Sequence, residues 1–181
     1  MPAAFAAAIV AGYLPFIGVG WRVFGFLPGY AGEEGFDAGG TGFYLLGVLR
    51  QLPPLAELSG RAYAIGASTI LVALGAAIAL TRDTARSPLA AATVLATIFM
   101  VFVSPHYPWY FAWLIVFACF IRSLALLWLT TACLLLYLVP VEFHIVRDAY
   151  RLTVESMIYG PFAALAVTDL WYHRRRATRS S

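Results

Sequence analysis

Lysine is absent from this sequence of 181 residues, and charged residues make up only 12% of it. Water-soluble domains carry about twice that share of charge. The few charges present form no basic face of the kind that binds nucleic acid. Hydrophobic residues make up 62% of the chain, and its mean hydropathy is +0.82. This composition indicates an integral membrane protein without a nucleic-acid partner.

Several chemical motifs are also missing. The two cysteines, Cys119 and Cys133, have no CxxC or metal-ligand spacing and predict neither a redox site nor a metal site. The glycine-rich stretch at 39–42 lacks the Gly-Lys-Ser/Thr ending of a nucleotide-binding loop. No basic residue precedes the first apolar run, as it would in a signal peptide. We therefore expect no metal ion, no cofactor and a first run that stays in the membrane.

Six apolar runs predict an all-α fold, a polytopic bundle of transmembrane helices over residues 1–172. A helix needs about 20 residues to cross the hydrocarbon core of a bilayer. The fourth and fifth runs are separated only by Arg122-Ser123, and an arginine at the centre of one long span would be costly. We therefore expect two helices joined by a tight turn. The runs cover residues 3–21, 62–81, 88–103, 108–121, 124–141 and 154–172, and a basic tail follows at 173–181.

The distribution of arginine predicts the orientation of this bundle. Seven of the twelve arginines fall on the side of the C-terminal tail, whereas seven of the nine acidic residues fall on the other side. Cytoplasmic loops of membrane proteins are enriched in basic residues. The pattern therefore predicts a multi-pass protein of the cytoplasmic (inner) membrane with both termini in the cytoplasm. The basic tail is expected to contact anionic lipid headgroups.

The long connection at residues 22–61 is then external. It is rich in glycine and contains the acids Glu33, Glu34 and Asp37. Glycine permits a close approach of the backbone to a ligand, although a flexible surface loop explains the composition equally well. The apolar residues at 43–49 end before a proline pair and predict a short interfacial helix, which could lie over the mouth of a cavity.

The segment Ser104–Tyr110 interrupts two apolar runs with two prolines, three aromatic residues and a histidine. Within a membrane, backbone released by proline is tolerated only where it is buried in protein or lines a wet cavity. The segment therefore predicts the wall of a site. Two simpler explanations stay open: the aromatic rings suit a membrane interface anyway, and a lone histidine is commonly a hydrogen-bonded neighbour.

Charged residues near the last apolar run have similar alternatives. Arg147 and Arg151 carry planar guanidinium groups that suit phosphate oxygens, but each could instead pair with Asp148 or Glu155. Glu155 and Asp169, near the two ends of this run, could mark a proton or ion path across the membrane. Because both lie close to an interface, we expect their carboxylates to reach interfacial water instead.

Three stretches carry a resemblance to a known family: Tyr13-Leu14-Pro15-Phe16 leading to Gly29-Tyr30-Ala31, Gly35-Phe36-Asp37 leading to Phe43-Tyr44-Leu45-Leu46, and Ser104–Tyr110 with Trp113. In this order they resemble the GT-C superfamily of membrane glycosyltransferases, particularly its bacterial mannosyltransferase-like branch, which uses polyprenyl-phosphate-linked sugars. The third looks like the Pro-Trp-Tyr element that opens a late helix in that family. Asp37 departs from the asparagine expected there, and the tryptophan usual just upstream is lacking.

The resemblance implies transfer of a hexose, such as mannose, from a polyprenyl-phosphate donor to an acceptor outside the cytoplasm. It implies polyprenyl-phosphate-linked sugar and membrane lipids as partners. It also implies that the chain is a C-terminal portion, inactive without an N-terminal half that holds the catalytic carboxylate; Glu33, Glu34 and Asp37 are the fallback bases. The other implied site residues contact lipid phosphate or sugar, and they are Arg50, His106, Tyr107, Trp109, Tyr110, Trp113, Arg147 and Arg151. A small non-catalytic membrane protein, acting as a transporter, flippase or assembly partner, is the alternative.

Overall fold

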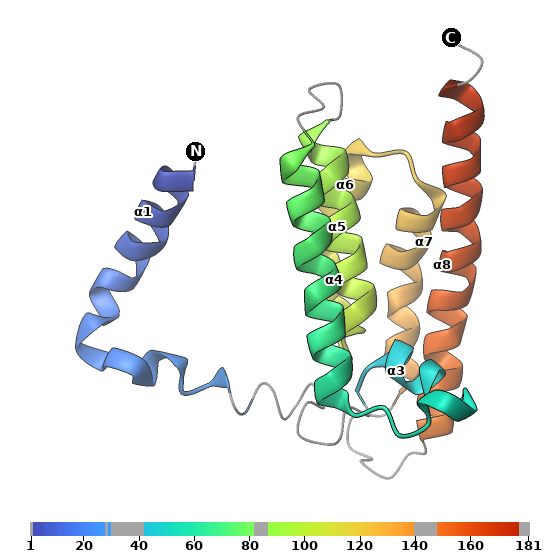
Figure 1. The fold of residues 1–181 in the computed structure, drawn as a ribbon, viewed down its shortest axis with the longest axis horizontal. Coiled ribbons are helices and arrows are strands. Elements are labelled where there is room, and N and C mark those ends of the chain that lie inside the picture. Colours follow the sequence, from blue (N-terminus) through green and yellow to red (C-terminus); the bar gives the residue numbers. More distant parts are fainter. Residues whose placement is uncertain (1, 28, 30–41, 82–86, 140–147, 178–181) are drawn as a thin grey trace.

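The computed structural model describes residues 2–27, 29, 42–81, 87–139 and 148–177, and every regular element in these ranges is a helix (Figure 1). The predicted all-α class is confirmed for these residues. The elements are α1 (Pro2–Tyr13), η1 (Leu14–Phe24), α3 (Tyr44–Leu49), η2 (Pro53–Leu55), α4 (Gly60–Leu80), α5 (Pro88–Val103), η3 (Pro108–Phe111), α6 (Ala112–Phe120), α7 (Leu124–Ala132), η4 (Cys133–Leu138) and α8 (Asp148–Ala177).

Two helical stretches within the described ranges, Ala3–Phe24 and Gly60–Leu80, are long and apolar enough to cross a membrane. The first shows no buried residue in its most apolar window, and the second only 6%. Apolar surface exposed on this scale is unusual for a protein surrounded by water. These helices therefore support membrane association. The other predicted spans correspond to α8 and to three shorter apolar helical stretches, Pro88–Val103, Pro108–Phe120 and Leu124–Leu138.

The first predicted span is not one regular helix. Its α-helical part, α1, ends at Tyr13, and a 3-10 segment continues to Phe24. Pro15 lies in the first turn of that segment, and Gly20 has a φ of 58°, outside the helical region. Proline cannot donate the backbone hydrogen bond that would continue the α-helix, and a positive φ favours glycine.

The core of the bundle is formed by α6, α7 and α8 together with the end of α5 and the 3-10 segments η3 and η4. Its fully buried side chains include Phe111, Leu114, Leu129 and Ile158. The Trp128 indole of α7 also donates to the Ile158 carbonyl of α8, with 2.9 Å between nitrogen and oxygen. This bond fixes α7 against α8 within one turn of Pro161, where proline perturbs the regular pattern of helix bonds.

The tight turn predicted at Arg122 is confirmed, because α6 ends at Phe120 and α7 begins at Leu124. The side chain of Ser123 caps α7 by accepting from the amide of Leu126 at 3.0 Å. Asp169 of α8 accepts from the Ser123 hydroxyl at 2.7 Å and from the Ala125 amide at 3.2 Å. A carboxylate is favourable at a helix N-terminus, so this contact fixes the turn against α8.

Candidate functional site

The segment after α5 forms a buried turn between two helices. Ser104 has a φ of 45°, the only positive value for a residue other than glycine in the described ranges, and its side chain is fully buried. Its amide donates to the Met100 carbonyl at 2.9 Å and its hydroxyl to the Val101 carbonyl at 2.8 Å. Pro105 and Pro108 are also buried. Left-handed backbone in a buried serine is strained, and such strain is concentrated at functional sites.

The aromatic residues that follow form a cluster, which we call the aromatic cluster: Tyr107, Trp109 and Tyr110. The rings of Tyr107 and Trp109 are stacked with their centroids 4.4 Å apart, and Tyr110 lies 6.3 Å from each of them. Tyr110 also packs against the core, whereas 54% of Trp109 is exposed. Trp113 of α6 is exposed as well. Exposed rings beside a fixed turn are suited to contacts with sugar or with a polyprenyl chain.

A buried polar cluster lies behind this turn. Arg151 donates through Nε to the Glu155 carboxylate at 2.8 Å, and Glu155 is 3% exposed. The side chain of Tyr159, which is also buried, lies close to that of Ser104. His106 lies within electrostatic range of Glu155. These five residues, Ser104, His106, Arg151, Glu155 and Tyr159, are called the polar cluster below, and they join α8 to the turn after α5.

The short helix α3 covers the polar cluster, and its existence confirms the predicted helix before the proline pair. It contacts α5 and α8, at the end of the bundle where α8 begins (Figure 1). Arg151 donates through Nη2 to the carbonyl of Gly42, directly before this helix. The ring of Tyr44 stacks on Tyr159 at 4.7 Å. Gly47 permits the close approach of α3 to α8, since a Cβ there would lie 3.1 Å from Leu152 Cδ1.

The predicted site residues are thus brought together only in part. His106 and Arg151 lie in the polar cluster, and the alternative that Arg151 pairs with Glu155 is confirmed. Arg50 donates through Nε to the Leu58 carbonyl at 2.9 Å, a contact that holds the connection between α3 and α4. Four further predicted residues lie outside the described residues, and these are Glu33, Glu34, Asp37 and Arg147.

The expectation that Glu155 reaches interfacial water is wrong. Its carboxylate is buried because Arg151, one turn earlier on α8, supplies the partner that burial requires. Tyr159 follows one turn later. The spacing of residues 151, 155 and 159 places them on one face of a helix and was the available sequence signal for this site. The contacts with Gly42 and Ser104 join distant parts of the chain and leave no such signal.

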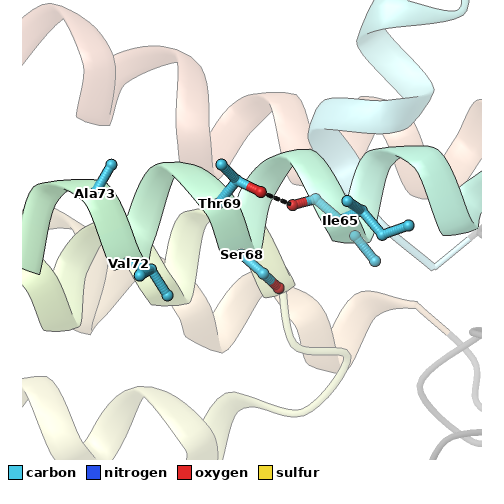
Figure 2. A pocket seen from close by; sticks show the side chains of 6 residues that line it. Ile65, Ser68, Thr69, Val72 and Ala73 are labelled. Carbon is cyan, nitrogen blue, oxygen red and sulfur yellow. Dashed lines mark hydrogen bonds between the residues drawn. The ribbon is translucent and has the colours of Figure 1, made fainter.

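A separate apolar depression of about 570 Å³ lies along the exposed side of α4 (Figure 2). The Thr69 hydroxyl there donates to the Ile65 carbonyl of the same helix at 2.8 Å. The small residues of this helix, at positions 66, 67, 73, 75, 76, 77 and 79, predict a close helix contact. Helix α4 does contact α5, but Gly66 and Gly75 make no close contact within the described residues, because a Cβ at either position would meet no atom within 4 Å. The depression is lined by Ala64, Ile65, Ser68, Thr69, Val72 and Ala73.

Comparisons with known proteins identify no relative of this chain. Within the described ranges, no three His, Cys, Asp or Glu side chains gather in an arrangement that could hold a metal ion. No protein-family model matches the chain, and neither the curated proteins nor the solved structures give a significant match. The likeness to the GT-C superfamily therefore rests on the three sequence stretches and on no alignment.

Proposed function

We propose that this chain binds a polyprenyl-phosphate-linked sugar at the end of the bundle covered by α3. In this proposal it belongs to a glycosyltransferase of the GT-C type, which transfers a hexose such as mannose to an acceptor outside the cytoplasm. One observation carries the proposal. Arg151 of α8 is bonded to Glu155, and Glu155 lies within electrostatic range of His106 in the strained turn that also carries the aromatic cluster.

The chemistry of the donor explains this combination of side chains. A departing polyprenyl phosphate needs cationic or oriented donors around its oxygens, and a guanidinium supplies planar donors of this kind. The sugar and the polyprenyl chain need aromatic and apolar surface, which Trp109 and Trp113 expose. Glu155 is engaged by Arg151 and buried, so it does not reach an acceptor hydroxyl as a base must. Glu33, Glu34 and Asp37 stay the candidates for that role.

The proposal includes six membrane spans, with both termini in the cytoplasm and residues 22–61 outside. The alternating directions of α4 to α8 support it, since they bring residues 42–59, the turn after α5 and the start of α8 to one end of the bundle (Figure 1). The opposite end holds the Arg122 turn and the end of α8. The arginine-poor end is then external.

Cysteine labelling tests this orientation. With Cys119 and Cys133 replaced by alanine, Asp37→Cys should react with an impermeant maleimide in intact cells, because residue 37 is external. Thr178→Cys should react only after the membrane is permeabilised, because the tail is cytoplasmic. The cysteine-free chain is the control for background labelling. Labelling of both positions from the same side would contradict the six-span orientation.

Lipid binding tests the site. In nanodiscs of phosphatidylcholine, native mass spectrometry should show tighter binding of polyprenyl phosphate than of neutral polyprenol. Replacing both Trp109 and Tyr110 with alanine should weaken the binding of both lipids alike, by about 3–10-fold, because aromatic contact does not depend on phosphate charge. The matched control is Trp171→Ala near the other end of α8, since Trp109 and Trp171 are 54% and 55% exposed.

Two outcomes of this measurement would count against the site. Equal binding of both lipids by the wild-type chain would show that phosphate charge does not contribute to binding. Equal effects of the Trp109/Tyr110 and Trp171 variants would reduce the aromatic cluster to an ordinary interfacial belt. Either result would favour the non-catalytic alternative, a small helical transporter, flippase or assembly partner.

A further inference from the structure

Arg151 links two parts of the molecule that lie far apart in the sequence. Its Nε donates to Glu155 on the same helix at 2.8 Å, while its Nη2 donates to the Gly42 carbonyl just before α3. The side chain of Arg151 is 17% exposed, against 4% for that of Glu155. The guanidinium is therefore partly exposed, whereas the carboxylate that anchors its Nε is buried.

The two acceptors differ in strength. Glu155 is a carboxylate that bonds a cation with full charge, whereas the Gly42 carbonyl is neutral. Both bonds have a charged donor, but only the bond to Glu155 also has a charged acceptor, so the Coulomb attraction is larger there. An incoming phosphate oxygen would compete poorly for Nε, where Glu155 is buried beside it. It would compete well for Nη2, where it would replace a neutral oxygen with a charged one.

We propose that Arg151 exchanges acceptors when a polyprenyl phosphate binds, giving up the Gly42 carbonyl for a phosphate oxygen and so loosening the start of α3. Glu155 is the positioning residue of this exchange, because its bond to Nε keeps the guanidinium in place in both states. This inference rests on the proposed function, since it names how the phosphate of that ligand is received.

The remaining contacts of α3 determine how strongly loss of the Gly42 contact would affect this helix. Phe43 lies against Tyr63 with ring centroids 5.1 Å apart, and Tyr44 stays stacked on Tyr159. Loss of the Gly42 contact would therefore loosen α3 without detaching it. The amides of Gly47 and Arg50 report on this helix, because they donate to Phe43 and Leu46 carbonyls at 3.0 and 2.9 Å.

Hydrogen–deuterium exchange of the full chain in phosphatidylcholine nanodiscs tests the proposal. Polyprenyl phosphate should speed exchange at the Gly47 and Arg50 amides by about 3–10-fold, the expected effect of losing one hydrogen bond. Neutral polyprenol and inorganic phosphate at the same concentration should not, because one lacks the charge and the other the apolar chain. The Tyr63 amide, bonded to the Ser59 carbonyl at 3.0 Å, is the internal control.

Two variants distinguish the effect of the Arg151–Gly42 contact from the effect of the ligand. Without lipid, Arg151→Gln should already speed exchange at both reporter amides, and added polyprenyl phosphate should then change nothing. Glu155→Gln keeps an oxygen that can accept from Nε, so it should retain slow exchange without lipid and still respond to the phosphorylated lipid. Unchanged exchange in Arg151→Gln, or loss of the response in a folded Glu155→Gln chain, would overturn the proposal.

Lipid binding is measured in the same samples by native mass spectrometry. Bound polyprenyl phosphate with unchanged exchange at the reporter amides would overturn the acceptor exchange and leave the proposed function standing. Failure of polyprenyl phosphate to bind would overturn both. A response to inorganic phosphate equal to that of the lipid would overturn the assignment to a lipid ligand.

Discussion

Replacing Glu155 with alanine is expected to lower the free energy of unfolding by about 3–5 kcal/mol, because it leaves the Arg151 guanidinium without its buried partner. For a chain of this length the midpoint of thermal unfolding should fall by roughly 10 °C. The measurement is thermal unfolding of the purified chain in detergent. Arg151 would also lose the bond that directs it towards Gly42, so the contact between α8 and α3 should weaken together with the fold.

The matched control is Glu57→Ala. Glu57 is exposed, and exposed substitutions change stability by about 0.5 kcal/mol or less. A double variant separates charge from packing: Arg151→Met with Glu155→Leu removes both charges and keeps apolar volume, so it should recover most of the loss. If Glu155→Ala costs no more than Glu57→Ala, the ion pair does not hold the folded state together and the polar cluster loses its central contact.

The order of the helices and several of their ends were predictable because proline, glycine and arginine punctuate the apolar runs. The ends of α8, at Asp148 and Ala177, lie beyond the predicted run at 154–172. Pro88 begins α5 and the break at Ser104 ends it, as the sequence predicts. The turn at Arg122 follows from the cost of an arginine within a span. The proline pair at 53–54 follows the short helix α3, as predicted. These signals are local, so they could be read without knowing which helices are neighbours.

The candidate site was less predictable because its contacts are long-range. The bond from Arg151 to Gly42 spans 109 residues, and the exposure of Glu155 depends on what α3 covers. Chemistry-bearing residues could be named by type, as Arg151 and His106 were, and Glu155 could be named as a possible partner of Arg151. The contact of Arg151 with Gly42 could not. The sequence also did not show which face of each apolar helix points inward. A helix that is apolar on all sides has no periodic pattern to show which side is buried.

Helix α7 permits a direct test of its inward face through two leucines. Leu129 is fully buried, whereas Leu127 of the same helix is 55% exposed. Leu129→Ala should cost about 2–5 kcal/mol, because the side chains around it, including Leu114 and Ile158, cannot close the cavity. Leu127→Ala should cost about 0.5 kcal/mol or less, because surrounding lipid or detergent fills the space. Thermal unfolding in the same detergent compares them, and equal losses would contradict the packing of α7 against α6 and α8.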